Sequence, residues 1–232
     1  IIRGLVGSEM CIRDRVICNH PTGIADGIMI YHAINFVRPD LFFYANADAI
    51  RIFPQLSKFI APIQWMSDKR SLSSSRETLK FTKAAFDVER LAVIFPSGRL
   101  ASREGFHLVE RQWMTSAVSL AKKYNLPVIP IHIKARNSFL FYLFDQISNS
   151  LKDIMLFYEV LNKKKVKYTI NIGRSININS LPNDNNEAIK ILKSKVLSLN
   201  LKNKKKILDP IRKIINPISV SYTHLTLPTT EA

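Results

Sequence analysis

The sequence predicts an α/β domain whose central sheet is mainly parallel or mixed and is flanked by helices. Short apolar runs rich in β-branched residues alternate along the chain with segments of helical periodicity, and turn-forming residues separate them. Strands that alternate with helices are typical of βαβ units, which place neighbouring strands parallel. An apolar content of 47% in 232 residues is enough for one sizeable core and favours a single domain.

The apolar runs and the helical periodicity predict the positions of the individual elements. Strands are expected at residues 16–18, 41–46, 63–66, 92–95, 128–133 and 167–172. Helices are expected at residues 26–36, 76–89, 113–124 and, as a basic terminal helix, 185–201. In the second of these helices Phe81, Ala85 and Val88 recur at i, i+4 and i+7, which places them on one face.

Both ends of the chain differ from the sequence between them. Residues 1–15 and 219–232 share no periodicity with the segments that they flank, and they resemble peptides that arise when sequencing-adapter DNA is translated with an assembled read. The alternative is that they are ordinary termini. We therefore expect the genuine domain at residues 16–218, as a fragment open at both ends, and exclude the flanking segments from the fold prediction.

The net charge of +16 is concentrated in the last third of the chain, where residues 151–213 contain 15 Lys and Arg against 5 Asp and Glu. Such a basic surface attracts anionic phospholipid headgroups or nucleic acid, although a solvated face without a partner has the same composition. The two cysteines, Cys11 and Cys18, are too few for a disulfide framework and favour a reducing compartment. No run of 18 uncharged apolar residues occurs, so the sequence predicts no membrane-spanning helix within it.

The segment from Asn19 to Gly27 contains the strongest candidates for catalysis. His20 follows the first expected strand, Pro21 and Gly23 form a turn, and Asp26 stands at the start of a helix. Across a tight turn the carboxylate can fold back onto the imidazole, fix its tautomer and leave the other ring nitrogen free to take a proton from an alcohol. The alternative is that Asp26 is only a helix N-terminal acid and His20 an ordinary loop histidine.

Four motifs in order resemble those of the phospholipid and glycerol acyltransferase family, which includes lysophosphatidate and glycerol-3-phosphate acyltransferases. They are His20 with Asp26, then residues 63–70 (IQWMSDKR) at the place of a block that ends in a base, then residues 95–99 (FPSGR) at the place of a Phe-Pro-Glu-Gly block, and residues 128–132 (VIPIH) at the place of a Val-Ile-Pro-Val strand. The resemblance extends from His20 to about residue 174. It implies a glycerolipid acyltransferase-like fold.

Two features depart from the common family pattern. Five residues rather than four separate His20 from Asp26, a form similar to the hemolysin-like and ornithine-lipid branch. Ser97 stands where most members have Glu, and Arg99 directly follows Gly98. The function that the family's Glu has toward the acceptor therefore does not transfer to this chain.

The resemblance implies an O-acyltransferase of phospholipid biosynthesis. It would move a fatty acyl group from acyl-CoA or acyl carrier protein to the hydroxyl of a lysophospholipid-like acceptor of the 1-acylglycerol-3-phosphate type, or alternatively to a lyso-ornithine lipid. His20 would be the general base and Asp26 its orienting partner, with no covalent intermediate, no cofactor and no metal. The residues expected at the substrate are Thr22, Gly23, Lys69, Arg70, Phe95, Pro96, Ser97, Gly98 and Arg99.

Within this set the basic residues Lys69, Arg70 and Arg99 would hold the acceptor's phosphate or carboxylate. Each of the three is equally compatible with a solvated surface charge. The turn at residues 95–98 would offer backbone N–H groups beside the reacting centre.

The predicted partners are an anionic membrane surface, the acyl thioester and the acceptor, and no nucleic acid is expected. The corresponding location is the cytoplasmic face of a bacterial inner membrane.

The aromatic run at residues 139–144, extended by residues 154–158, predicts either core packing or a surface for an acyl chain or the membrane interface. A different class of function is a non-catalytic basic protein that binds lipid or nucleic acid, which explains the charge but not the four ordered motifs.

Overall fold

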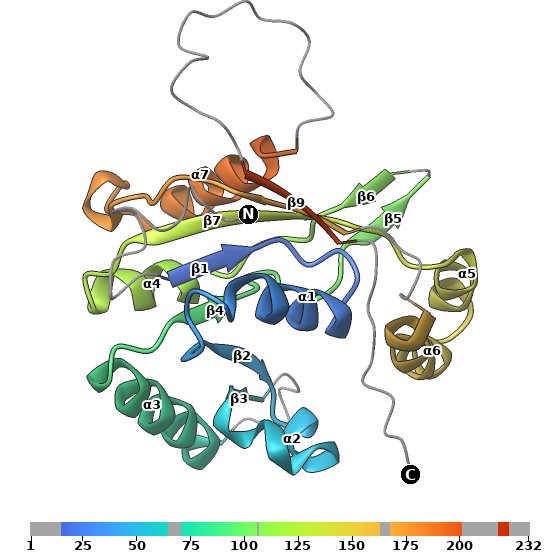
Figure 1. Ribbon diagram of the computed structural model, residues 1–232, viewed down its shortest axis with the longest axis horizontal. Coiled ribbons are helices and arrows are strands. Elements are labelled where there is room, and N and C mark those ends of the chain that lie inside the picture. Colours follow the sequence, from blue (N-terminus) through green and yellow to red (C-terminus); the bar gives the residue numbers. More distant parts are fainter. Residues whose placement is uncertain (1–14, 65–70, 106, 163–167, 201–217, 223–232) are drawn as a thin grey trace, which may run out of the picture.

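A mainly parallel sheet forms the centre of the molecule. The computed structural model describes residues 15–64, 71–105, 107–162, 168–200 and 218–222 (Figure 1). Within these residues, a seven-stranded sheet has the order β3-β2-β4-β1-β7-β8-β9. Its strands are β1 (Arg15–Cys18), β2 (Phe42–Asn46), β3 (Ile60–Ile63), β4 (Ala92–Ile94), β7 (Val128–Lys134), β8 (Tyr168–Ile172) and β9 (Ile218–Tyr222). Neighbouring strands are parallel along the part β3-β2-β4-β1-β7, whereas β8 is antiparallel to β7 and β9 is antiparallel to β8. The predicted α/β class is therefore confirmed.

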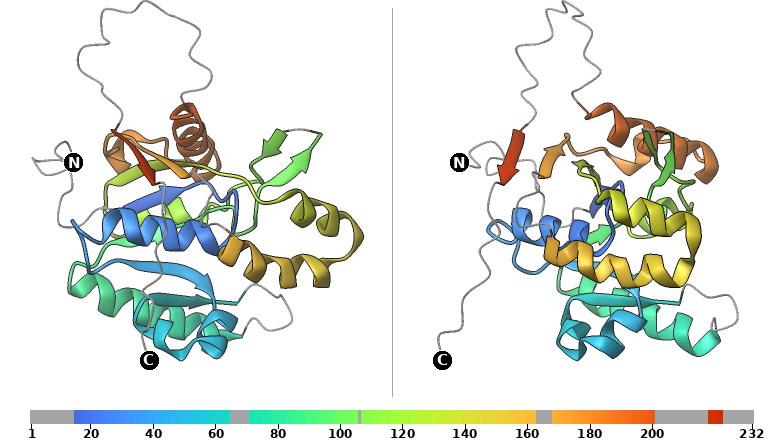
Figure 2. Two further views of the ribbon diagram at one scale, coloured as in Figure 1. Left: turned by 45° about the vertical axis from the view of Figure 1, so that its right-hand side comes forward. Right: turned by 90° about the vertical axis from the view of Figure 1, so that its right-hand side faces the viewer.

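Helices cover both faces of this sheet (Figures 1 and 2). The helix α1 (Ile24–Ile34) packs on one face, and α3 (Leu72–Asp87), α4 (Ser116–Lys123) and α7 (Asn185–Ser198) pack on the other. The pair α5 (Phe139–Ile147) and α6 (Asn149–Leu161) lies at one side, with α6 next to α1. The remaining elements are α2 (Asp48–Ile52), the 3-10 helices η1 (Pro54–Lys58) and η4 (Ile178–Ser180), and a hairpin of β5 (Ser102–Glu104) and β6 (His107–Val109).

The alternation of side chains along the central strands produces a core on each face. In β1, Val16 and Cys18 face α1, and Ile17 points to the side of α4 and α7. The neighbouring strand β7 follows the same alternation, with Ile131 on the α1 side. Burial on both faces explains why β1 and β7 are mostly apolar and do not alternate between apolar and polar residues.

The third predicted strand is wrong in its residue range. It was expected at residues 63–66, whereas β3 ends at Ile63, and residues 65 and 66 lie outside the described part of the chain. Pro62 argues against a strand in sequence because it cannot donate a hydrogen bond. The structure tolerates it because, within the described part of the chain, β3 is the edge strand of the sheet and β2 is its one partner.

Helix boundaries also differ from the predicted ones, because local caps and tertiary contacts set them. The helix expected from residue 76 begins at Leu72, where Ser71 caps it by accepting a hydrogen bond from the Ser74 N–H at 3.1 Å. The helix expected from residue 113 begins at Ser116, and Trp113 is instead a buried residue of the preceding extended segment. Neither α2 nor the β5–β6 hairpin was predicted, because elements of three to five residues carry no detectable periodicity.

Two elements extend into the segments that the sequence sets apart as foreign. Strand β1 begins at Arg15, and β9 pairs with β8 through residues 218–222. Arg15 is almost fully buried, its guanidinium lies 4.5 Å from the centre of the Phe86 ring, and no described residue hydrogen-bonds its side-chain nitrogens. Burial lowers the pKa of Arg15 to about 10. The proposed limits of the genuine domain stay predictions.

The carboxyl ends of the parallel strands lie at one edge of the sheet, and the candidate catalytic segments follow there. His20 comes two residues after β1, and Phe95 directly follows β4. In open parallel sheets this edge is where ligands bind. Among the described helices, none combines the length and the apolar character that crossing a bilayer requires.

Candidate active site

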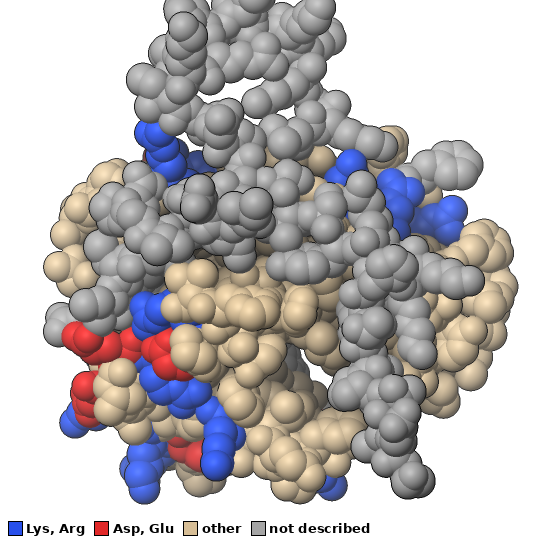
Figure 3. Space-filling model, in the orientation of Figure 1, with Lys and Arg blue, Asp and Glu red and all other residues tan. Residues whose placement is uncertain are grey.

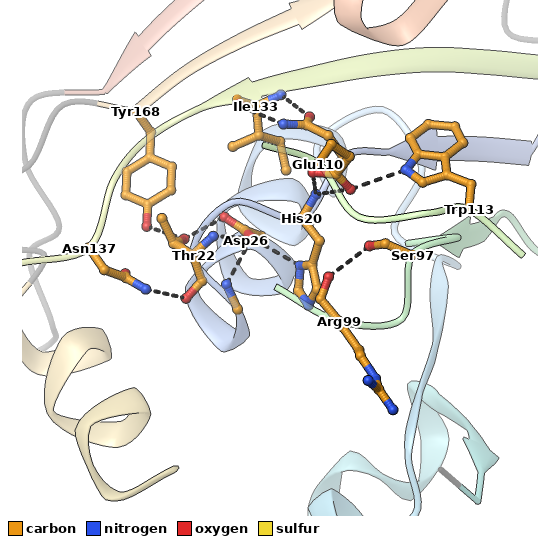
Figure 4. Close-up of polar contacts among 12 residues, drawn as sticks. His20, Thr22, Asp26, Ser97, Arg99, Glu110, Trp113, Ile133, Asn137 and Tyr168 are labelled. Carbon is orange, nitrogen blue, oxygen red and sulfur yellow. Dashed lines mark hydrogen bonds and ion pairs between the residues drawn. The ribbon is translucent and has the colours of Figure 1, made fainter. Parts of the chain in front are cut away.

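The structure brings His20 and Asp26 together. The Nδ1 atom of His20 lies 3.0 Å from Oδ2 of Asp26, which is the third residue of α1 (Figure 4). Asp26 is fully buried, whereas the His20 side chain is 19% exposed. The turn therefore lets the carboxylate fold back onto the ring despite the six-residue separation.

Asp26 is held by the same loop that carries the histidine. Its Oδ2 also accepts hydrogen bonds from the backbone N–H groups of Thr22 at 2.8 Å and Gly23 at 2.9 Å, and its Oδ1 accepts one from the Thr22 hydroxyl. Four donors directed at one carboxylate fix its orientation. An ionised carboxylate only accepts hydrogen bonds, so in neutral His20 the proton is on Nδ1 and Nε2 is the free acceptor.

The imidazole ring of His20 is fixed on its other sides. It stacks on Phe95 with the ring centres 4.4 Å apart and an angle of 28° between the planes. Its backbone carbonyl accepts a hydrogen bond from the Ala101 N–H at 2.9 Å. Among the residues that the structure describes, none hydrogen-bonds Nε2, and the partial exposure of the ring leaves this atom open to a substrate hydroxyl.

Glu110 is a residue of the site that the sequence did not reveal. Its buried carboxylate accepts hydrogen bonds from the His20 N–H at 3.2 and 3.3 Å and from the Trp113 indole at 3.1 Å. Burial raises the pKa of Glu110. On α7, Lys193 donates to the carbonyl of Glu110 at 2.9 Å and thereby ties this segment to the terminal helix. The sequence carried no signal for it, because Glu110 stands next to Arg111 in a stretch with several other charged and polar residues.

The segment from Phe95 to Gly98 forms a tight turn beside His20. The N–H of Gly98 donates to the carbonyl of Phe95 at 2.9 Å, and Gly98 has a φ of 58°, which glycine adopts without strain. Pro96 and Ser97 are buried, and the Ser97 hydroxyl donates to the carbonyl of Arg99 at 2.8 Å. The N–H of Gly98 and the hydroxyl of Ser97 therefore stabilise the turn itself. The expected donation of backbone N–H groups to a substrate stays a prediction.

One of the three predicted basic anchors lies among the described residues. Arg99 is exposed, and Figure 4 shows its guanidinium directed away from the His20 ring. Lys69 and Arg70 lie outside the described residues, so their roles stay predictions.

Gly23 and Thr22 lie at the base of the loop. Gly23 has a φ of +94°, and a Cβ at this position would lie 2.9 Å from Leu100 and 2.9 Å from Leu156 of α6. Thr22 is buried, with its hydroxyl bonded to Asp26 and its carbonyl accepting a hydrogen bond from the Asn137 side chain at 3.3 Å. The Thr22 hydroxyl therefore faces the carboxylate rather than the solvent.

His132, the last residue of the motif at residues 128–132, lies on β7. It is buried on the opposite face of β7 from Ile131 and Ile133, toward α7, and it is not part of the His20 site. Burial, assisted by the charge of Lys134, lowers the pKa of His132 to about 4, so the ring is neutral at pH 7. Among the described residues, no group of three or more His, Cys, Asp or Glu side chains is arranged to hold a metal ion.

The fold and the site together define an α/β protein in which one histidine, beside the carboxyl ends of parallel strands, is oriented by one buried carboxylate. The family model described as acyltransferase matches residues 15–134, which is more than half of the chain. The chain belongs to this acyltransferase family, and the resemblance read from the four motifs is confirmed.

Two curated relatives carry the same printed name, lyso-glycine lipid O-acyltransferase. The protein of Phocaeicola vulgatus is 25% identical over 166 residues, which cover 69% of this chain and 58% of the relative. The protein of Bacteroides thetaiotaomicron is 20% identical over 166 residues, which cover 69% of this chain and 59% of the relative. The chain thus spans about three fifths of the length of these relatives.

Proposed function

We propose that the protein is an O-acyltransferase that moves a fatty acyl group from a thioester donor, acyl-CoA or acyl carrier protein, to the hydroxyl of a lyso-lipid. The observation that carries this proposal is the orientation of His20, whose Nδ1 is bonded to Asp26 while Nε2 is free. Membership of the acyltransferase family and the two lyso-lipid relatives support it.

In the proposed mechanism Nε2 of His20 takes the proton from the acceptor hydroxyl as its oxygen attacks the thioester carbonyl. Asp26 stabilises the imidazolium that forms, at a distance of 3.0 Å. The tetrahedral intermediate then collapses, the carbon–sulfur bond breaks, and the imidazolium returns the proton to the leaving thiolate. Because the nucleophile belongs to the substrate, the reaction involves no acyl-enzyme and no cofactor.

The relatives favour an amino-acid lipid as the acceptor, since both are named for a lyso-glycine lipid. This agrees with the ornithine-lipid type of spacing between His20 and Asp26 and with Ser97 at the position of the family's usual Glu. A 1-acylglycerol-3-phosphate-type acceptor in phospholipid biosynthesis is the second candidate, favoured by the order of the four motifs. Both acceptors combine a hydroxyl with an anionic headgroup.

A cavity of about 190 Å³ offers a place for such a headgroup. It is lined by Arg103, His107, Leu108, Arg136, Asn137, Phe139 and Tyr142. Asn137 also donates to the carbonyl of Thr22, so the cavity adjoins the loop that holds Asp26. Guanidinium groups bind carboxylate and phosphate oxygens in a bidentate manner, and this makes Arg103 and Arg136 the candidates for the headgroup contact.

We further propose that the protein acts at the membrane surface through the apolar side of α5 and α6. The large exposed apolar residues of this pair are Phe139, Leu140, Leu143, Ile147, Leu151, Ile154, Phe157, Tyr158 and Leu161. In Figure 3 the uncovered atoms on the side where α5 lies in Figure 1 are tan. Exposed apolar side chains in such number are typical of an interaction with lipid or protein.

Three features favour lipid as the partner of this apolar surface. Leu156 of α6 contacts Gly23, so the helix pair adjoins the catalytic loop. Lys134 and Arg136, just before α5, are exposed and suit anionic headgroups. An acyl acceptor also resides in a membrane. The cytoplasmic face of a bacterial inner membrane is the proposed location.

One assay tests the activity. The purified protein, with anionic vesicles, is supplied with acyl-CoA or acyl carrier protein and, side by side, with a lyso-glycine lipid, a lyso-ornithine lipid and 1-acylglycerol-3-phosphate, and thiol release is followed together with the acylated product. We expect acceptor-dependent release that His20→Ala abolishes and His32→Ala, an exposed control on α1, leaves unchanged. Full turnover in His20→Ala would refute the assignment of the base.

A further inference from the structure

A buried tyrosine from a distant strand contacts the loop of the candidate site. Tyr168 is the first residue of β8, and its hydroxyl lies 2.8 Å from the Thr22 hydroxyl (Figure 4). The same Thr22 oxygen is hydrogen-bonded to Oδ1 of Asp26. All three side chains belong to residues that are at most 1% exposed, so bulk water does not compete for these contacts. Tyr168 also lies beyond residues 15–134, which the family model matches.

The protons fix the direction of each hydrogen bond in this chain. The Asp26 carboxylate can only accept, so the Thr22 hydroxyl must donate its single proton to Oδ1. The Thr22 oxygen is then an acceptor toward Tyr168, and the tyrosine hydroxyl must be the donor. The proton order runs from Tyr168 to Thr22 to Asp26, and His20 donates to the other carboxylate oxygen.

The two oxygens of Asp26 are held unequally. Oδ2 accepts from the His20 ring and from two backbone N–H groups, whereas among the described residues the Thr22 hydroxyl is the donor to Oδ1. The rotation of the carboxylate about its Cβ–Cγ bond therefore depends on the rotamer of Thr22. That rotamer is in turn fixed by the donation from Tyr168, and buried hydrogen bonds in series strengthen one another.

We propose that Tyr168 is a positioning residue that acts through the Thr22 hydroxyl to hold the Asp26 carboxylate in the plane that orients His20. This role rests on the proposed function of His20 as the base. It also assigns Thr22, which the sequence places at the substrate, to the support of the carboxylate. The hydroxyl of Tyr168 does not reach the reacting atoms, because Thr22 and Asp26 stand between it and the imidazole.

Several other titratable groups lie near Tyr168 and Asp26, and a test must leave them in place. They are the Cys18 thiol on β1, the Glu110 carboxylate, the Tyr142 hydroxyl on α5 and the Glu159 carboxylate on α6. Arg136 interacts electrostatically with the Tyr142 hydroxyl. Substituting Phe for Tyr168 changes none of them and keeps the aromatic ring in the core.

The chain offers a matched control for this substitution. The hydroxyl of Tyr44 on β2 lies 3.0 Å from the hydroxyl of Thr82 on α3, so a second Tyr–Thr hydrogen bond exists outside the site. Tyr44→Phe removes the same type of hydrogen bond as Tyr168→Phe. Equal losses of thermal stability in the two variants are compatible with the proposal, and only the readouts at His20 separate them.

The experiment compares the wild type, Tyr168→Phe, Thr22→Val, the double variant and Tyr44→Phe. For Tyr168→Phe we expect kcat to fall about 5- to 30-fold with KM within about twofold, which corresponds to the loss of one buried hydrogen bond. In Thr22→Val, kcat should fall by at least the same factor. Adding Tyr168→Phe to Thr22→Val should lower kcat further by less than about twofold, and Thr22→Ser should keep most of the wild-type activity. Multiplicative losses in the double variant would overturn the proposal, because Tyr168 would then not act through Thr22.

A second readout does not depend on turnover. The NMR signals of the His20 ring nitrogens, assigned through the signals that His20→Gln removes, should shift in Tyr168→Phe because the hydrogen bond between Nδ1 and Asp26 changes, and should stay unchanged in Tyr44→Phe. If the wild type releases no thiol, the proposed function fails while these NMR signals still decide the positioning role. Unchanged His20 ring signals in Tyr168→Phe overturn the role of Tyr168, whatever the activity of the wild type.

Discussion

Replacing Asp26 by Asn is expected to remove the charge beside His20 while keeping the shape of the site. An amide oxygen at the position of Oδ2 can still accept from the His20 ring and from the N–H groups of Thr22 and Gly23, and the amide nitrogen can donate to the Thr22 hydroxyl. The imidazolium of the transition state then loses an anion 3.0 Å away. At an effective dielectric constant of about 20 the attraction over this distance is about 5.5 kcal/mol, or roughly 10⁴-fold in rate.

We therefore expect kcat of Asp26→Asn to fall by about three to four orders of magnitude. Thiol release from acyl-CoA at saturating acceptor measures it, and circular dichroism with thermal unfolding establishes that the variant is folded. Asp48→Asn is the control, since that carboxylate forms an exposed pair with Arg51. If folded Asp26→Asn retains more than about a tenth of the wild-type kcat, the negative charge is not used in the transition state and the reasoning is refuted.

Three further predictions concern stability. Gly23→Ala should lower stability by about 2 kcal/mol and Tm by roughly 4–8 °C, because the new Cβ meets Leu100 and Leu156 at a positive φ; an unchanged Tm contradicts this. His132, whose pKa is lowered by burial to about 4, stays neutral in the native state while the unfolded state gains a proton below about pH 6.5. Stability should therefore fall by about 2 kcal/mol between pH 7 and pH 5 in urea titrations, and His132→Leu should remove most of that fall. Arg15→Met should raise Tm by a few degrees, since the buried guanidinium lacks hydrogen-bond partners among the described residues; a lower Tm would mean that its stacking on the aromatic rings dominates.

The architecture could be predicted because buried parallel strands leave a clear record in sequence. Residues 92–94 form a continuous apolar run that a turn signal follows, and residues 128–133, mostly apolar, follow the break at residues 125–127. The errors lie where burial is one-sided or absent. Strand β3 was misplaced because Pro62 is harmless only at a sheet edge, and the start of α3 was missed because a serine cap has no hydrophobic period.

The candidate pair of His20 and Asp26 could be named from sequence, but the residues that support it could not. The contact between His20 and Asp26 depends on residues of one short loop, so spacing and residue type were sufficient to suggest it. Tyr168 and Glu110 stand 146 and 90 residues from their partners Thr22 and His20. Only the pairing of β8 with β7 and the fold of the β5–β6 hairpin bring them to the site, and neither is encoded in a local pattern.

The way in which the loop grips Asp26 has a consequence for insertion and deletion of residues. The carboxylate is bonded to the N–H groups of Thr22 and Gly23, so the loop closes on itself at that point, whereas Ile24 just after it is exposed. A residue inserted between His20 and Thr22 would lengthen the loop without lengthening the contact between the His20 ring and the Asp26 carboxylate. This contact therefore does not depend on the exact loop length, and a family in which this spacer varies by one residue can keep a single chemistry.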